Sequence, residues 1–153
     1  MGSFRLTAGS LHLHRQFNFA DFINELSRLL ALLKEREIEC FIYKPFQEYL
    51  IKNYEFETSS SGSFEYENEL PKDISLLLSL GGDGTFLKSF LIAQNRSIPL
   101  MGVNSGRLGF LSDVSRDEID KAITDILDGN YFIDERTVLE LEFEREGGVA
   151  PLS

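Results

Sequence analysis

A glycine-rich stretch with one carboxylate, Gly-Gly-Asp-Gly-Thr at 81–85, has the residue types of a phosphate or ribose site. The apolar run at 74–80 predicts a buried strand before it, and the pattern at 86–91 predicts a helix after it. Glycines permit a tight turn without side-chain bulk, so backbone N–H groups can approach a ligand while the helix N-terminus points at the same place. The alternative is a plain strand-to-helix turn with a solvated aspartate.

A second glycine-rich loop follows the next predicted strand. The apolar run at 98–103 leads into 104–111, Asn-Ser-Gly-Arg-Leu-Gly-Phe-Leu. In an open parallel sheet, the carboxyl ends of the strands lie on one edge, and ligands bind in the crevice beyond them. The two loops are therefore expected to form one site.

Together, the two motifs resemble those of the NAD kinases, whose hallmark is Gly-Gly-Asp-Gly-Thr followed by Asn-x-Gly-x-Leu-Gly-Phe-Leu. Diacylglycerol kinases, sphingosine kinases and phosphofructokinases carry loops related to the first motif, so the second motif selects NAD kinase among them. The resemblance covers residues 74–141. It implies that ATP or another phosphoryl donor phosphorylates the 2′-hydroxyl of the adenosine ribose of NAD to give NADP. Mg²⁺ or another divalent cation is expected with the donor, held mainly by phosphate oxygens.

Phosphoryl transfer depends on alignment, charge stabilisation and a carboxylate that accepts the proton of the nucleophile. Asp83, the only carboxylate inside a glycine loop, is the predicted general base. Thr85 is predicted to cap the next helix, with a phosphate contact as the alternative. Phe110 and Leu111 are predicted to be core residues rather than adenine contacts. The predicted nucleotide-binding residues are Gly81, Gly82, Asp83, Gly84, Thr85, Lys88, Asn104 and Arg107; no metal ligand is predicted.

Two of these side chains, Lys88 and Arg107, have open alternatives, and Asn104 has a single expected role. Family members often place a basic residue at the position of Lys88 against the nucleotide, and a solvated helix lysine is the other interpretation. Arg107 can bind phosphate bidentately, or it can pair with a surface acid. Asn104 is expected to close its turn through its side chain.

The rest of the pattern predicts an α/β fold with an open, mostly parallel, doubly wound Rossmann-like sheet and flanking helices. Helical spacing of apolar residues at 22–33 follows Asn18 as the predicted N-cap, and 38–43 predicts a strand. A short helix is expected at 46–52, with Pro45 in its first turn. Residues 4–10 are at most a degenerate form of the first strand of the family.

The chain contains two further signals and one low-complexity tract. Residues 115–118 form a capping box before a helix that ends at Gly129. The polar tract at 57–73 predicts a surface loop, pinned to the body by Phe64 and Tyr66. We expect an α/β domain over 1–130 and the start of a second, β-rich domain over 131–153, with its first strand at 131–143. Most of that domain is expected to be missing, together with the Asn-Glu or Asn-Asp pair that grips the NAD ribose in the family, so this chain alone is expected to be incomplete.

The amino-acid composition limits the classes of function that this protein can have. The 153 residues suffice for one domain, and the 42 % hydrophobic and 26 % charged shares are typical of globular proteins. A net charge of −10 argues against nucleic acid as a partner. We find no membrane-spanning run and no signal peptide in the sequence, which predicts a cytoplasmic location. The single cysteine, Cys40, is expected to be buried and reduced. The full-length protein is expected to be a homo-oligomer.

Two rival functions remain at this stage. One is a lipid or sugar kinase of the same superfamily, which a panel of substrates would distinguish from an NAD kinase. The other is a non-catalytic nucleotide-binding or assembly domain.

Overall fold

Six parallel strands form the central sheet of the computed structural model, which describes residues 5–9, 22–56, 58–104, 109–112, 114–139, 144–145 and 148–149. The strands are β1 (Arg5–Gly9), β2 (Glu39–Tyr43), β3 (Gly62–Phe64), β4 (Leu76–Leu80), β5 (Leu100–Asn104) and β6 (Val114–Ser115). They lie in the order β3-β2-β1-β4-β5-β6, and every neighbouring pair is parallel. This is the strand order of a doubly wound nucleotide-binding sheet, so the predicted Rossmann-like α/β fold is confirmed.

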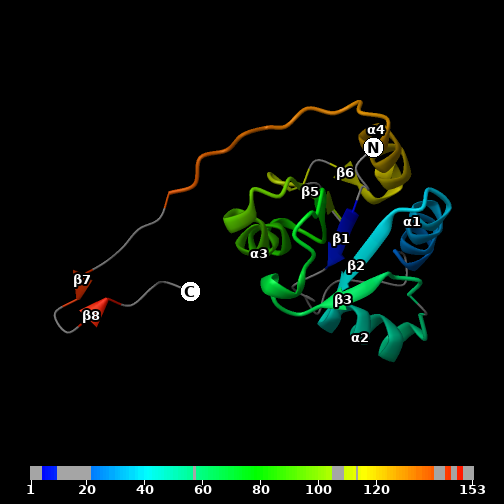
Figure 1. Ribbon diagram of the computed structural model, residues 1–153, viewed down its shortest axis with the longest axis horizontal. Helices are drawn as coiled ribbons and strands as arrows, with labels where there is room; N and C mark the ends of the chain where they lie inside the picture. Colours follow the sequence, from blue (N-terminus) through cyan, green and yellow to red (C-terminus); the bar gives the residue numbers. More distant parts are fainter. Residues whose placement is uncertain are drawn as a thin grey trace.

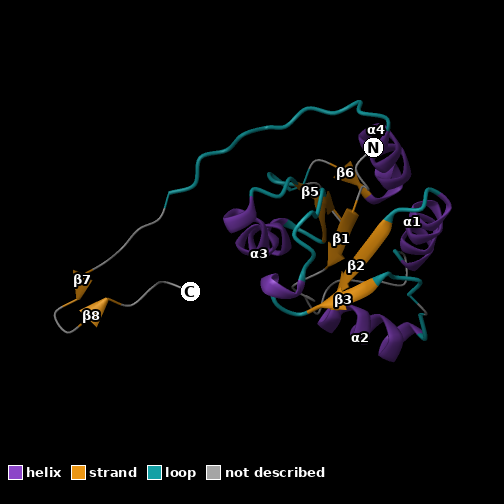
Figure 2. Ribbon diagram, in the orientation of Figure 1, coloured by secondary structure: helices purple, strands orange, loops and turns teal. Residues whose placement is uncertain are grey.

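Helices cover both faces of this sheet (Figures 1 and 2). They are α1 (Ile23–Glu35), α2 (Lys44–Tyr54), α3 (Asp83–Ala93) and α4 (Ile119–Leu127). Short 3₁₀ turns, η2 (Glu67–Glu69), η3 (Gln94–Arg96) and η4 (Arg116–Glu118), lie between them. The larger core joins the apolar sides of α1, α2 and α4 to one face, whereas a smaller core lies on the other face with α3.

Side-chain alternation along the fully buried strand β4 divides these two cores. Leu76, Leu78 and Leu80 belong to the larger core, and Leu77 belongs to the smaller one. A central strand buried on both faces needs apolar residues at nearly every position. The continuous run of leucines that predicted this strand therefore has a direct structural reason.

The buried cysteine was predicted correctly. Cys40 lies in β2, is 3 % exposed and belongs to the larger core. Burial raises the pKa of its thiol to about 12, because the apolar surroundings disfavour the thiolate. Its role in the described structure is packing.

The predicted surface loop at 57–73 is wrong for residues 62–64. These residues form the edge strand β3, which pairs with β2, and the Phe64 side chain is buried in the smaller core. Tyr66, expected to help pin the tract, is 64 % exposed. Only one of the two aromatic rings therefore anchors this segment.

Helix boundaries agree with the sequence patterns within a few residues. α1 begins at Ile23 with Phe22 at the cap position, and the predicted cap Asn18 lies outside the described residues, as does the stretch from 10 to 21. Pro45 lies in the first turn of α2, as expected, although the helix is longer than predicted. The Ser115 capping box, with Glu118 as its acid, is also confirmed.

The strand predicted from residue 131 is wrong over 131–139, which lies along an exposed path without regular structure (Figure 1). Tyr131, Phe132, Ile133, Val138 and Leu139 are all exposed. A strand forms only where its backbone groups find partners, and no described strand pairs with this segment. The two-residue strands β7 (Glu144–Arg145) and β8 (Gly148–Val149) pair with each other, and residues 140–143 lie outside the described part. None of the helices in the described part of the chain combines the length with the apolar composition that a membrane span requires.

Candidate functional site

The first glycine motif joins β4 to α3 at the point where the order of strand addition in the sheet reverses. The chain proceeds from β1 outward to β3 and then returns to β4 on the other side of β1. In folds of this kind, ligands bind beyond the carboxyl ends of the strands at this switch point. The connection consists of Gly81 and Gly82, and α3 begins directly at Asp83.

This start corrects two predictions. The helix was expected from Phe86, but it begins at Asp83, and Gly82 rather than Thr85 occupies the N-cap position. Thr85 is the third residue of α3 and is 5 % exposed. Its side chain lies beneath the turn, so it is a packing residue of the site.

Three positions of the motif are occupied by glycine for different structural reasons. Gly81 has a φ of 154°, and a Cβ on it would lie 2.5 Å from Thr85 Oγ1. A Cβ on Gly82 or Gly84 would meet nothing within 4 Å, and both residues are exposed. Of the three glycines in this motif, only Gly81 is therefore required by contacts within the described part of the chain. The bare backbone at 82 and 84 leaves room for a ligand to approach.

The second motif reaches Asp83 through its backbone. The N–H of Phe110 donates to Asp83 Oδ2 at 3.0 Å, and the N–H of Leu111 donates to Oδ1 at 3.1 Å. Gly109 lies against the same carboxylate: a Cβ there would lie 2.2 Å from Oδ1 and 2.7 Å from Cγ. The two loops therefore meet at Asp83, as expected from their positions after neighbouring strands.

These contacts were not assigned from the sequence. Gly109 stands inside the recognised motif, but a glycine alone does not indicate which group approaches it. The donors at Phe110 and Leu111 are backbone N–H groups, which almost every residue carries. The only available signal was a glycine directly before the two donors.

The expected core role of Phe110 is wrong, because its side chain is 93 % exposed. Leu111 is partly buried. Residue 110 is tied down by its backbone N–H rather than by its ring. The aromatic ring is therefore open to solvent, while the backbone of the same residue contacts the Asp83 carboxylate.

The remaining predicted residues are placed as follows. Asn104 ends β5, is 4 % exposed and pairs in register with Ser115 of β6. Lys88 is exposed on α3, five positions after Asp83, which is about 140° around a helix. The structure thus does not place Lys88 on the same side of α3 as the carboxylate. Arg107 lies outside the described residues.

Close packing holds α3 against the sheet. A Cβ on Gly102 of β5 would lie 2.6 Å from Ser112 Oγ and 2.7 Å from the ring of Phe86. The Ser89 hydroxyl donates to the carbonyl of Thr85 at 3.0 Å inside the helix. The absence of a side chain at residue 102 lets the first turn of α3 lie directly on β5, which fixes the position of Asp83.

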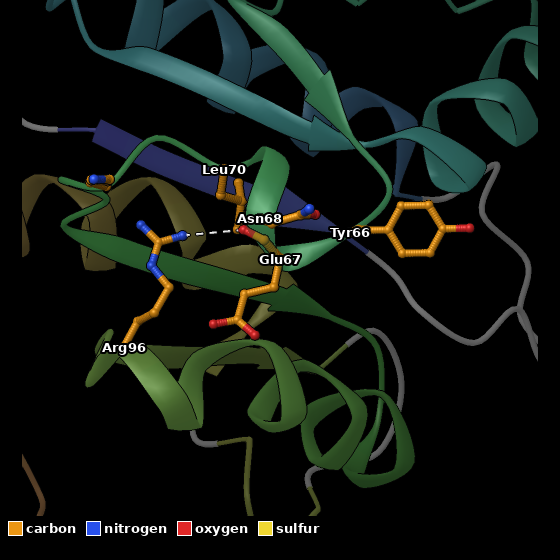
Figure 3. A pocket seen from close by; sticks show the side chains of 6 residues that line it. Tyr66, Glu67, Asn68, Leu70 and Arg96 are labelled. Atoms are coloured by element: carbon orange, nitrogen blue, oxygen red, sulfur yellow. Dashed lines mark hydrogen bonds between the residues drawn. The ribbon is translucent and has the colours of Figure 1, made fainter.

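A separate hollow of about 600 Å³ lies at the other end of α3 (Figure 3). It is lined by Tyr66, Glu67, Asn68, Leu70, Lys72 and Arg96. The guanidinium of Arg96 donates to the carbonyls of Glu67 and Pro71, which ties η3 to the segment that follows β3. The hollow contains none of the motif residues. Among the described residues, no group of three or more His, Cys, Asp or Glu side chains could hold a metal ion.

Sequence similarity links this chain to known proteins. The family described as "ATP-NAD kinase N-terminal domain" matches residues 21–131. An NAD kinase of Flavobacterium psychrophilum is 36 % identical over 117 residues, which is 76 % of this chain and 40 % of that protein. An NAD kinase of Bacteroides fragilis is 35 % identical over 113 residues, or 74 % of this chain and 38 % of that protein. The chain thus spans about two fifths of the length of these relatives.

The fold has a counterpart of known structure. Yeast NADH kinase, crystallised with NADH, superposes with a TM-score of 0.60 at 17 % identity, over 84 % of this chain and 39 % of that one. At this identity the likeness concerns the fold alone. The match over residues 21–131 and the identity to the bacterial enzymes decide the family: the chain belongs to the NAD kinase family.

Proposed function

We propose that this chain supplies the catalytic aspartate and the phosphate-binding loop of an NAD kinase. The reaction would transfer the terminal phosphoryl group of ATP to the 2′-hydroxyl of the adenosine ribose of NAD, giving NADP and ADP. The observation that carries the proposal is the Asp83 carboxylate, held by two N–H groups of the second motif at the switch point of the sheet. Family membership supplies the substrates.

Asp83 is the group that would accept the proton of the ribose hydroxyl. Each of its oxygens accepts one backbone N–H, and a carboxylate oxygen has a second lone-pair direction for a substrate hydroxyl. The carboxylate stands at the first residue of α3, beside the exposed backbone of Gly82 and Gly84. A sugar hydroxyl and a phosphate can therefore approach the same turn without meeting side-chain bulk.

The donor and the cation take supporting roles. The N-terminus of α3 offers N–H groups to the donor phosphates, and Arg107 is a candidate cation for them. A divalent cation would neutralise phosphate charge, and we assign its coordination to phosphate oxygens because the described residues offer no cluster of ligands. Residues 1–130 are assigned to the α/β domain and residues 131–153 to the start of a second, β-rich domain. The full-length enzyme is proposed to be a cytoplasmic homo-oligomer.

The experiment measures NAD binding by titration calorimetry and NADP formation with ATP and Mg²⁺. It uses this chain and the protein encoded by its complete open reading frame. Asp83→Asn is expected to lower turnover by about 10²- to 10⁴-fold, the range for loss of a general base. Asp134→Asn is the matched control: it removes the same charge from an exposed carboxylate that pairs with Arg136, and it should leave turnover unchanged.

Two results would contradict the proposal in different ways. If neither protein binds NAD or forms NADP, the kinase function is wrong, and binding of ATP alone would favour the non-catalytic alternative. If NADP forms and Asp83→Asn turns over at the rate of the control, the function stands but Asp83 is not the base.

A further inference from the structure

We propose that Gly109 is a positioning residue of the active site and that residues 109–111 form a backbone clamp for the Asp83 carboxylate. The kinetic part of this inference rests on the proposed kinase function, whereas its structural part does not. The clamp consists of the two N–H donors at 110 and 111 and the bare Cα of Gly109. It would fix the direction in which the base presents its oxygens.

The two hydrogen bonds define the orientation of the carboxylate. Consecutive N–H groups of Phe110 and Leu111 meet different oxygens of Asp83, at 3.0 Å and 3.1 Å. A single bond would leave the carboxylate free to rotate about its own axis, whereas two bonds to separate oxygens fix that rotation. An aspartate at the first residue of a helix, with its backbone also fixed, then has one preferred arrangement.

Gly109 is what allows the carboxylate to reach this position. A Cβ on Gly109 would lie 2.2 Å from Oδ1, 2.7 Å from Cγ and 2.9 Å from Oδ2, and real Cβ atoms essentially never approach other atoms below 3.0 Å. The added Cβ would overlap with all three atoms of the carboxylate group. A methyl group here must therefore displace either the base or the loop that holds it.

Such a displacement acts on catalysis rather than on general packing. General bases work within a narrow range of distance to the proton that they accept, and misplacement by about 1 Å can cost roughly 10²-fold in rate. Substrate binding depends on many other contacts. We therefore expect a change in kcat that exceeds any change in KM.

The kinetic test compares Gly109→Ala with Gly129→Ala in the protein from the complete open reading frame. Gly129 lies after α4 with a φ of 78° and open space around it, so alanine there strains the backbone without touching either motif. Gly109→Ala is expected to lower kcat by roughly 10- to 100-fold, with KM for NAD within about threefold of wild type. Gly129→Ala should retain the wild-type kcat. Equal kcat values for Gly109→Ala and wild type would overturn the positioning role.

A second measurement needs no activity. Amide hydrogen exchange of Phe110 and Leu111, followed by NMR in this chain, should be slowed in wild type and accelerated at least tenfold in Asp83→Ala, with no change in Gly129→Ala. Unchanged exchange in Asp83→Ala would overturn the clamp. If wild type makes no NADP while exchange responds as expected, the proposed function fails and the clamp stands.

Discussion

Thr85 lies against the backbone of Gly81, four residues before it, so closely that a Cβ on Gly81 would be 2.5 Å from Oγ1 and 2.9 Å from Cβ of the threonine. The first turn of α3 thus packs on the residue that leads into it. The backbone N–H of Gly81 also continues the sheet, because it donates to the carbonyl of Val103 at 2.9 Å. Gly81 is held from both sides.

We expect Gly81→Ala to lower the free energy of unfolding by roughly 1–3 kcal/mol, because the new methyl group meets Thr85 and the residue keeps a φ of 154°. Gly82→Ala is the matched control, with no atom within 4 Å of its Cβ, and it should cost less than about 1 kcal/mol as a change of N-cap residue. Urea unfolding of both variants measures the difference. Equal losses would show that the contact with Thr85 is relieved by a small shift.

Phe110→Ala should change the free energy of unfolding by less than about 0.5 kcal/mol, because the ring is 93 % exposed and the backbone N–H that binds Asp83 is retained. If NAD binds at this edge of the sheet as proposed, the same variant should weaken NAD binding, because an exposed aromatic ring in the second motif offers the adenine a stacking surface worth roughly 1–3 kcal/mol. Calorimetric titration with NAD, together with urea unfolding, tests both parts. Leu139→Ala, another exposed apolar side chain, serves as the control and should affect neither quantity.

The buried thiol of Cys40 makes the free energy of unfolding depend on pH in the alkaline range. Burial raises the pKa of its thiol from 9.0 to about 12, so the unfolded thiol ionises first as the pH rises. The neutral buried thiol therefore contributes fully to the free energy of unfolding below pH 9. This contribution is lost between pH 9 and about 12, at up to about 1.4 kcal/mol per pH unit. Cys40→Ala should show a shallower loss of stability over this interval than wild type. Parallel curves for the two proteins would refute this assignment.

Arg96→Ala removes the donors that join η3 to the carbonyls of Glu67 and Pro71. A net loss of roughly 1–3 kcal/mol is expected, because the carbonyl groups lose charged hydrogen-bond partners. Amide exchange should accelerate at β3 and η2 before it does so at β4. Arg136→Ala, which alters an exposed pair with Asp134, should cost less than about 1 kcal/mol.

The sequence predicted the fold correctly where a segment has its own periodic pattern of apolar residues. The leucines of β4 and the helical spacing in α1 depend on local periodicity, so both elements lie within a few residues of the prediction. β3 has only three residues and no apolar run, and it becomes a strand because β2 offers it an edge. The error from Tyr131 onward is the opposite one: the apolar residues there predicted a strand, but residues 131–139 form none, because they have no pairing partner among the described residues.

The candidate site was predictable as far as side-chain types determine it. Asp83 and the glycines around it stand out because few residue types carry a carboxylate or permit so bare a turn, and their functional roles stay predictions. The clamp could not, because its donors are backbone groups and residue type does not reveal them. Thr85 was misassigned as the cap since the sequence does not show that α3 begins at the aspartate itself.

The position of β1 between β2 and β4 also bears on the order in which the protein is built. The backbone N–H of Arg5 bonds to the Ser75 hydroxyl, 70 positions along the chain, and Leu6 pairs with Leu76. Closing a loop of this length costs entropy that only later contacts repay, and sheets with such distant pairings form slowly. On the ribosome, β1 and β2 can meet early, but the other edge of β1 has no partner until β4 has emerged. The nascent chain must therefore keep one edge of its central strand unpaired during much of its synthesis, and this is the interval in which it would need protection from aggregation.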